Sequence, residues 1–405
     1  KSKLKFIKFP FSHPSYILYT SGTTGAPKAI VHSTGGVILQ HFKEHKLHND
    51  LRFNDRIMWY TNIAWMMYHW VVSSLGCNAT LVLYDGVPIT KKNNNFDGSL
   101  LWKVADKEKL THLGISPKYI STLEDINENP INKYNINSLR WLLAAGSPVA
   151  PSQFDWIYKN IKKDIGFASI SGGSEVLACF MLGSPLHPVR RGELTVKGLG
   201  MSVEIYNSKN ESVIGEPGDL VCTEPFPSMP ITFWGKDGDA RYKKTYFEER
   251  KEVWTHGDLA ELKPHGSGVI YGRTDNTLNP GGVRIGTAEI YNICELFTEI
   301  EDCLVFGNQI NNDEEIILCI KLSHNNKLDN KLSKIIRSKI RENASPRHVP
   351  QKIYEVTDIP YTMNGKRVEG AAKWMLAGKE IPNLSSISNP ECLKQYAGLN
   401  NKKAL

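Results

Sequence analysis

A run of ten residues, Tyr19-Thr-Ser-Gly-Thr-Thr-Gly-Ala-Pro-Lys28, combines glycines, hydroxyl side chains and a lysine directly after a predicted strand. Glycines at positions 22 and 25 let backbone amides approach an anion, and Lys28 adds a positive charge for phosphate oxygens. Further donors are the hydroxyl groups of Ser21, Thr23 and Thr24. The run is not a Walker P-loop, because Ala29 stands where that loop has a serine or threonine for magnesium. It predicts a loop that holds a polyphosphate.

The elements that must position this loop begin with short β-rich runs that alternate with helical stretches from Tyr16 to about Gly172. Such alternation indicates crossover units and a mainly parallel sheet. The expected buried strands are Tyr16–Thr20, Ile57–Thr61, Thr80–Tyr84, Thr111–Ile115 and Leu139–Leu143. The expected helices are Gly36–His45, Trp65–Gly76 and Ser152–Lys162.

The character of the sequence changes beyond Glu193. Short strands separated by Gly/Pro turns predict a β-rich subdomain that reaches Tyr271. A small α+β domain is expected after the glycine-rich loop at 273–286, and residues 383–405 are expected to form a tail. The expected elements of the small domain are the helices Thr287–Phe297 and Leu332–Glu342 and the strands Cys303–Gly307, Ile316–Leu322 and Lys352–Val356.

The composition bounds the class of protein. With 405 residues, two or three domains are expected, and 41% apolar with 22% charged residues exclude a disordered, collagen-like or coiled-coil chain. The net charge of +7 is spread out rather than gathered in a basic stripe, which argues against a nucleic-acid partner. Without a long apolar run or a secretory signal, a soluble protein without a membrane span is expected. Seven scattered cysteines predict free thiols in a reducing compartment.

Three histidines, His41, His45 and His48, recur at helical spacing within an expected helix. Glu44 is the acidic residue that accompanies them, and it is expected on a different face of the helix. We therefore expect a partly exposed helix face rather than a metal site or a pH switch.

The order of several motifs resembles that of the adenylate-forming superfamily, which includes acyl-CoA synthetases, luciferases and peptide-synthetase adenylation domains. Tyr19–Lys28 resembles its phosphate loop. The further matching segments are Ala145-Gly-Ser-Pro148, Ser169-Ile-Ser-Gly-Gly-Ser-Glu175, His256-Gly-Asp258, Gly272-Arg-Thr-Asp275 and Ile359-Pro-Tyr-Thr-Met-Asn-Gly-Lys366. The resemblance implies an α/β fold with a large adenylation domain over residues 1–274 that lacks its N-terminal part. A mobile α+β domain over 275–382 would be hinged near Asp275.

The resemblance also implies the chemistry: ATP activates a carboxylic acid as an acyl-adenylate, and coenzyme A then takes the acyl group. Lys28, Arg284 and Lys366 would be catalytic, and Glu175 would bind Mg²⁺. Gly282 would line the pantetheine channel, and Arg337 is a candidate for a CoA phosphate. The implied ATP-binding residues are Thr20, Ser21, Gly22, Thr23, Thr24, Gly25, Lys28, Gly146, Ser147, Pro148, Ser174, Asp258, Arg273 and Arg284.

Several stretches are similar in particular to members of the superfamily that activate acetoacetate, among them Lys28-Ala-Ile-Val-His32 and Pro227-Ser-Met-Pro230. The resemblance implies that Ser171, Gly172 and Gly173 line the acid pocket, in a stretch where acetate-activating relatives carry a bulky tryptophan that shortens the pocket. Here Gly172 and Gly173 are expected to leave room for a four-carbon β-keto acid, with Trp65 as another wall. Met66 and Met67 fit that wall or an ordinary helix core. The predicted reaction converts acetoacetate, ATP and CoA to acetoacetyl-CoA, AMP and pyrophosphate in the cytosol.

Members of this superfamily carry a substantial portion before the phosphate loop, whereas only eighteen residues precede Tyr19. Part of the acid and CoA sites is therefore expected to be missing, and the chain is either a partial sequence or a trimmed paralogue. Two alternatives stay open: another short-chain acyl-CoA synthetase, or a non-catalytic protein that binds a nucleotide or an acyl group. The joint presence of five motif residues favours the enzyme: Lys28, Glu175, Asp258, Arg273 and Lys366.

Overall fold

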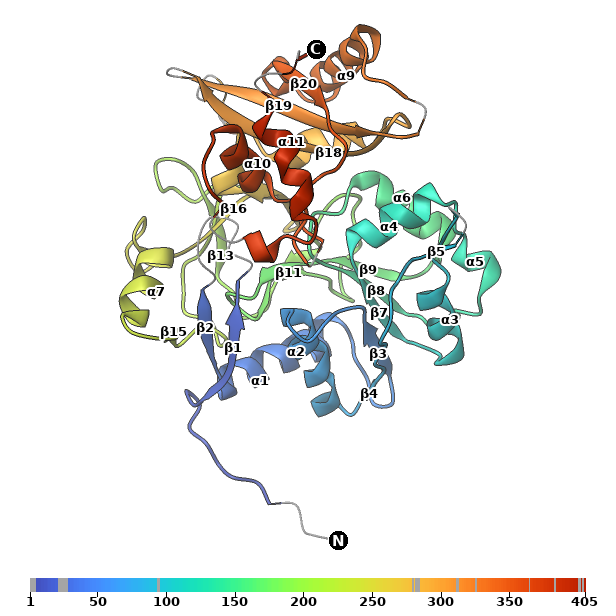
Figure 1. Ribbon diagram of the computed structural model, residues 1–405. Helices are drawn as coiled ribbons and strands as arrows, with labels where there is room; N and C mark the ends of the chain where they lie inside the picture. Colours follow the sequence, from blue (N-terminus) through green and yellow to red (C-terminus); the bar gives the residue numbers. More distant parts are fainter. Residues whose placement is uncertain are drawn as a thin grey trace.

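A five-stranded parallel sheet lies at the centre of the larger part of the chain in the computed structural model (Figure 1). The structure describes residues 5–20, 28–92, 95–278, 280, 285–310, 313–324, 326–363, 365–381, 384–399, 402, 404 and 405. In spatial order the strands of the sheet are β4 (Thr80–Leu81), β3 (Arg56–Trp59), β7 (His112–Ile115), β8 (Trp141–Ala144) and β9 (Gly166–Ser169). The predicted parallel sheet is thereby confirmed, and β9 is a strand that the sequence pattern did not indicate.

Helices cover both faces of this sheet, which is why β7 and β8 are buried along their whole length. On one face, Trp102, Ile120 and Phe154 share a hydrophobic cluster with the strands. On the other face, Met66, Met67 and Trp70 do so, which makes the two methionines helix core. The helices are α1 (Thr34–Lys43), α2 (Met66–Val72), α3 (Leu100–Lys107), α4 (Pro117–Asp125), α5 (Pro130–Lys133) and α6 (Pro151–Asn160), and a small hairpin is formed by β5 (Thr90–Lys92) and β6 (Asn95–Asp97).

The strand before the expected phosphate loop differs from its prediction. We expected a buried strand of the parallel sheet, but β1 (Pro14–Tyr19) forms an antiparallel hairpin with β2 (Ala29–Ser33), whose other edge pairs with β15 (Thr232–Phe233). Of the six residues of β1, only Leu18 is buried. The apolar residues of β1 could not distinguish an exposed hairpin from a buried strand, because partner strands are set by distant parts of the chain.

An antiparallel part joins this hairpin and confirms the predicted β-rich subdomain. It contains a four-stranded sheet, a three-stranded sheet and the helix α7 (Gly238–Phe247), which packs beside β15 and β16. The four-stranded sheet has the order β13 (Val203–Tyr206), β14 (Gly218–Cys222), β16 (Trp254–Leu262) and β17 (Gly268–Arg273). The three-stranded sheet has the order β10 (Ser171–Gly173), β11 (Ala178–Leu182) and β12 (Val196–Lys197).

The C-terminal part is a small α+β unit at the top of Figure 1. Its long strand β19 pairs antiparallel with β18 and parallel with β20. The described residues of the expected tail pack into this unit: Tyr396 and Leu399 are fully buried, and Leu405 exchanges two backbone hydrogen bonds with Ile353. The elements are α8 (Thr287–Cys294), β18 (Ile300–Ile310), β19 (Asp313–Leu322), α9 (Asn330–Asn343), β20 (Lys352–Glu355), α10 (Glu369–Leu376) and α11 (Lys394–Ala397).

The histidine-bearing helix corrects one expectation. His41, His45 and His48 are 0%, 0% and 2% exposed, so the predicted partly exposed face is wrong. Glu44 is also fully buried and lies in the same network, because a π-helical turn over Glu44–His48 follows α1 and changes which residues share a face. Hydrogen bonds to distant backbone compensate the burial of these polar rings, and no helical spacing reveals such partners.

Two general expectations can also be checked. All seven cysteines lie in the described part of the chain, and each is a buried free thiol, as predicted. None of the helices among the described residues is both long and apolar enough to cross a bilayer.

A buried ion pair holds the four-stranded sheet, and its removal gives a first prediction. The Arg250 guanidinium donates to the Asp219 carboxylate at 2.7 Å, and both side chains are 6% exposed. Asp219 is paired in register with Leu259, one residue from Asp258. Arg250→Met should lower the free energy of unfolding by about 3 to 5 kcal/mol, because it leaves a buried carboxylate without its counter-charge. Urea unfolding measures the change. The exposed Arg190→Met should change it by less than about 0.5 kcal/mol, and equal effects would contradict the assignment.

Candidate functional site

The turn between β10 and β11 presents Glu175, the predicted metal ligand. Backbone amides of Val176 and Leu177 both donate to the Gly173 carbonyl and close the turn. The Glu175 side chain is half-buried. Burial raises the pKa of its carboxyl. The opposite effect is larger and comes from His256, Arg273, a backbone hydrogen bond and Lys366, so the net pKa lies below the usual value. Glu175 is therefore an ionised carboxylate in a positively charged setting.

Asp258 and Arg273 are brought face to face by the register of β16 and β17, in which they are direct partners. The Arg273 guanidinium donates to the Asp258 carboxylate at 3.1 Å and to the His256 carbonyl at 3.1 Å. Gly257, which stands between His256 and Asp258 in the sequence, has φ +85°. A Cβ there would lie 2.9 Å from the Arg273 guanidinium. The glycine of this motif thus serves the approach of the arginine, which keeps the two predicted ribose-binding residues together.

Lys366 comes to this site from the small domain. It follows Gly365, whose φ is +73°, in a turn closed by the hydrogen bond from the Thr362 amide to the Lys366 carbonyl. The Lys366 ammonium lowers the pKa of the Glu175 carboxyl and of the His256 ring, so it lies within electrostatic range of both. The structure thereby brings together three predicted residues that are far apart in the sequence: Glu175, Arg273 and Lys366.

Lys28 lies at the start of β2, where its amide donates to the Thr20 hydroxyl at 3.2 Å and its carbonyl accepts from the Thr20 amide. Its ammonium is 5.8 Å from the centre of the Tyr246 ring. That ring is stacked on Trp254 at 3.8 Å, and burial together with the charge of Glu175 raises the pKa of the Tyr246 phenol. Tyr246 therefore links the end of the phosphate-loop motif to the Glu175 turn.

Trp65 and Gly146 are neighbours, although one was predicted for the acid pocket and the other for ATP. Gly146 has φ +114°, and a Cβ there would come within 3.9 Å of the Trp65 ring. Trp65 is half-buried, while Ser147 and Pro148 are exposed. The segment after β8 and the residue before α2 therefore lie side by side.

The glycine pair after Ser171 has a physical reason other than the one expected. A Cβ on Gly172 would lie 2.0 Å from the Ala178 carbonyl oxygen, so this glycine is required by the close approach of β11. A Cβ on Gly173 would lie 2.4 Å from a carboxylate oxygen of Glu175. Gly173 thus keeps the space beside the Glu175 carboxylate open, while a role of either glycine in acid size stays a prediction.

Several predicted residues lie outside the described part of the chain: Ser21, Gly22, Thr23, Thr24, Gly25, Gly282, Arg284 and the side chain of Asp275. Arg337 is described, and its guanidinium is engaged within the small domain. It donates to the Ser333 hydroxyl and to the backbone carbonyls of Pro350, Gln351 and Leu405. This geometry favours a structural role for Arg337 over the expected contact with a CoA phosphate.

The donor set fits Mg²⁺ better than a softer metal. Among the described residues, no three His, Cys, Asp or Glu side chains gather as a metal centre. A single ionised carboxylate is what Mg²⁺ commonly takes from a protein when phosphate oxygens and water supply the other ligands. Glu175, ionised and half-buried, has the chemistry that such a ligand requires.

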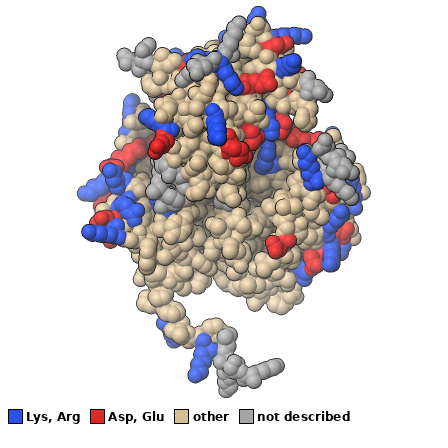
Figure 2. All heavy atoms as spheres, in the orientation of Figure 1, with Lys and Arg blue, Asp and Glu red and all other residues tan. Residues whose placement is uncertain are grey.

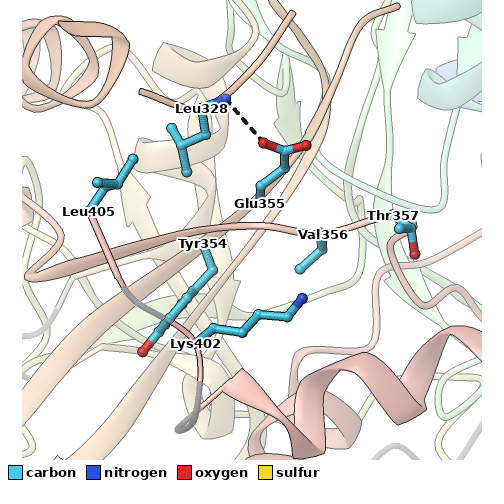
Figure 3. A pocket seen from close by; sticks show the side chains of 7 residues that line it. All are labelled: Leu328, Tyr354, Glu355, Val356, Thr357, Lys402 and Leu405. Atoms are coloured by element: carbon cyan, nitrogen blue, oxygen red, sulfur yellow. Dashed lines mark hydrogen bonds between the residues drawn. The ribbon is translucent and has the colours of Figure 1, made fainter. Parts of the chain in front are cut away.

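The surface charges and the pocket on the small domain do not identify a further part of the site. Lys/Arg and Asp/Glu side chains are interspersed over the upper part and the flanks of the face shown in Figure 2. A pocket of about 370 Å³ lies on the small domain, where Glu355 accepts a hydrogen bond from the Leu328 amide and Lys402 lies on the opposite wall (Figure 3). None of the predicted site residues lines it.

The sequence reasoning missed residues that support the site from behind. His32 on β2 contacts the Ser174 carbonyl at 2.8 Å through Nε2. His256 is buried against Phe180, with ring centres 4.6 Å apart, and burial lowers its pKa. His256 could have been noticed, because it opens the motif that ends at Asp258, and His32 closes a stretch that was singled out for another reason. Tyr246 lay outside every motif.

With the fold and this geometry established, comparisons with known proteins give the family. The family model for AMP-binding enzymes matches residues 8–229, more than half of the chain. The chain belongs to the AMP-binding enzyme family.

Individual proteins of known name show which members of the family this chain is similar to. Acetoacetyl-coenzyme A synthetase of Rhizobium meliloti (strain 1021) is 46% identical over 401 residues, which are 99% of this chain and 61% of that protein. Acetoacetyl-CoA synthetase of Gallus gallus is 44% identical over 98% of this chain and 59% of its own length. The solved acetoacetyl-CoA synthetase from Streptomyces lividans superposes with a TM-score of 0.91 at 37% identity, over 99% of this chain and 61% of that one. The chain thus spans about six tenths of the length of these relatives.

Three buried histidines give a prediction for the pH dependence of stability. Burial lowers the pKa of His32 to about 4, of His45 to about 3 and of His112 to about 4, whereas the unfolded rings titrate near 6.5. Between pH 6.5 and 4 the unfolded chain binds protons that the folded chain does not. Stability is therefore full above pH 6.5 and falls by about 1.4 kcal/mol per pH unit for each ring on acidification.

Urea unfolding at several pH values between 7 and 5 measures this slope. His112→Gln should reduce it by about one proton, whereas the exposed His324→Gln should leave it unchanged. A slope that is the same in both variants and in the parent protein would contradict the burial argument.

Proposed function

We propose that this chain carries out the ATP-dependent activation of the acid in an enzyme that joins acetoacetate to coenzyme A. The carboxylate of acetoacetate would attack the α-phosphorus of ATP, forming acetoacetyl-adenylate and releasing pyrophosphate. The CoA thiol would then attack the acyl carbon and release AMP. The likeness to acetoacetyl-CoA synthetases over nearly the whole chain supports the choice of acid. The predicted setting in the cytosol belongs to the same proposal.

The first step brings two anions together, and fixed positive charge must lower the barrier between them. Lys28, at the end of the phosphate loop, would hold the departing pyrophosphate. Asp258 would accept hydrogen bonds from the ribose hydroxyls while Arg273 keeps its carboxylate in place. Glu175 would hold Mg²⁺, which when bound screens the phosphate charge. Arg284, outside the described residues, would lie near the α-phosphate.

One observation carries the proposal. Lys366 belongs to the small domain, and its charge acts on Glu175 and His256 of the large part. Mere nucleotide binding does not need a second domain to bring an ammonium to this carboxylate. A lysine at this place can stabilise the negative charge on the incoming carboxylate and on the bridging oxygen of the α-phosphate. Adenylation requires such a fixed positive charge.

The second step would use a different arrangement, in which Lys366 is withdrawn and the thiol of CoA is admitted. The small domain would turn about residue 275 after adenylation, and Gly282 would then line the channel for the pantetheine arm. A polar contact between the two parts joins the Lys118 ammonium and an Asp302 carboxylate oxygen at 3.6 Å. An exposed lysine in such a pair holds weakly, which suits a contact that must break.

The choice of acid is tested by ATP–pyrophosphate exchange in the full chain with acetoacetate, 3-hydroxybutyrate, butyrate and acetate. We expect exchange with acetoacetate to exceed that with the other acids at equal concentration. Faster exchange with another acid would replace acetoacetate by that acid. No exchange with any of them, while ATP still binds, would favour a non-catalytic nucleotide-binding protein.

Lys366→Ala should separate the two half-reactions. Pyrophosphate exchange should fall by about 10²-fold to 10³-fold, because a fixed charge at the reacting oxygens is lost. Thioester formation from supplied acetoacetyl-adenylate should stay near normal. The matched control is Lys379→Ala, an exposed lysine of the same domain, which should affect neither step. Equal loss of both half-reactions in Lys366→Ala would contradict the domain rotation.

A further inference from the structure

One face of α1 and of the π-helical turn after it is polar although it is completely buried. Gln40, His41, Glu44 and His45 are each 0% exposed. Polar side chains are found at this depth where hydrogen bonds compensate their lost hydration. A π-helical turn often marks a functional region. This face contains none of the predicted site residues, and its partners show what it holds.

Two of these side chains bind the backbone of the turn that carries Glu175. The His41 ring donates through Nε2 to the Leu177 carbonyl at 2.7 Å, and because a carbonyl can only accept, this nitrogen carries the hydrogen. The Glu44 carboxylate accepts from the Cys179 amide at 2.9 Å and is itself fixed by the Trp70 indole N–H at 2.7 Å. Hydrogen bonds thus hold the backbone at Leu177, the last residue of the turn, and at Cys179, the second residue of β11.

The turn needs such support. Leu177 has φ +46°, a left-handed conformation that a branched side chain rarely adopts. Within the turn, the amides of Val176 and Leu177 both donate to the Gly173 carbonyl. A carboxylate two residues before such a strained position keeps its direction only if the surrounding structure holds the backbone.

We propose that His41 and Glu44 are positioning residues that hold the segment 174–179 in the conformation that places the Glu175 carboxylate beside Gly173. The proposal rests on the proposed function only where it makes Glu175 a ligand of Mg²⁺. His45 provides a contrast on the same helix. It is equally buried, but its Nε2 contacts the Trp70 carbonyl at 2.9 Å and the Ser73 hydroxyl at 3.0 Å, and neither belongs to the turn.

Amide hydrogen exchange in the full chain without ligands tests the positioning directly. His41→Leu should speed exchange in the segment 171–181 by about 5-fold to 10-fold, the effect of one lost hydrogen bond. His45→Leu, the matched control, should leave that segment unchanged even if it lowers the melting temperature as much. His41→Gln, whose amide can donate to the same carbonyl, should restore slow exchange. Equal exchange of the segment in the two leucine variants would overturn the proposal.

Should His41→Leu fail to fold, Glu44→Gln serves instead, because an amide in place of the carboxylate leaves one of the Cys179 and Trp70 donors facing another donor. The same segment should exchange faster, and unchanged exchange there would overturn the role of Glu44.

The Mg²⁺ dependence of pyrophosphate exchange separates this proposal from the proposed function. His41→Leu should raise the half-saturating Mg²⁺ concentration by about 10-fold to 100-fold, the usual effect of losing a group that supports a ligand, and His45→Leu should not. Glu175→Gln is measured alongside. If Glu175→Gln leaves the Mg²⁺ dependence unchanged, the metal assignment fails, whereas hydrogen exchange still decides whether His41 holds the turn.

Discussion

The charge balance at one carboxylate governs the arrangement of this molecule. Glu175 is drawn out of water by its position, which by itself would favour the neutral acid. Neighbouring groups reverse that tendency: His256 on β16 has the largest effect, Arg273 at the end of β17 comes next, and a backbone hydrogen bond and Lys366 of the small domain add to it. The lowered pKa of Glu175 thus comes mainly from the antiparallel sheet that carries His256 and Arg273, and the second domain adds a smaller effect through Lys366. The fold can be understood as what brings these charges together.

Strand register and glycine positions account for much of the side-chain placement at the site. Asp258 and Arg273 face each other because they are paired in register, and Gly257 gives the guanidinium its space. Gly173 does the same for the Glu175 carboxylate. Behind the turn, His41 and Glu44 replace the apolar side chains that a core helix usually presents. A buried polar group costs stability if its partner moves, so these contacts tie the direction of Glu175 to the integrity of the core.

The sequence predicted the parallel sheet, the antiparallel subdomain and the small domain, because these depend on local periodicity and turn chemistry. It also identified the residues that meet at Glu175, through the resemblance of their motifs. It failed where the outcome depends on distant partners. β1 was expected in the parallel sheet, but its partners are β2 and, beyond it, β15. His41 was expected at a partly exposed surface, but its ring reaches a carbonyl 136 positions later in the chain. Residues 383–405 were expected to form a tail, yet Tyr396 is core.

The contacts of the small domain bear on the rotation that we propose for it. Its internal contacts are strong: Arg367 lies 4.3 Å from the Tyr291 ring and donates to Asp302, which also accepts from Tyr361. Its contacts with the large part include the packing of α8 beside β17 and the Lys118 ammonium, which lies 3.6 Å from an Asp302 carboxylate oxygen and 5.7 Å from the centre of the Tyr361 ring. A unit with many internal bonds can move as a rigid body. Lys366 could then be withdrawn from Glu175 without unfolding any element, because the turn that carries it is held by Thr362 of its own domain.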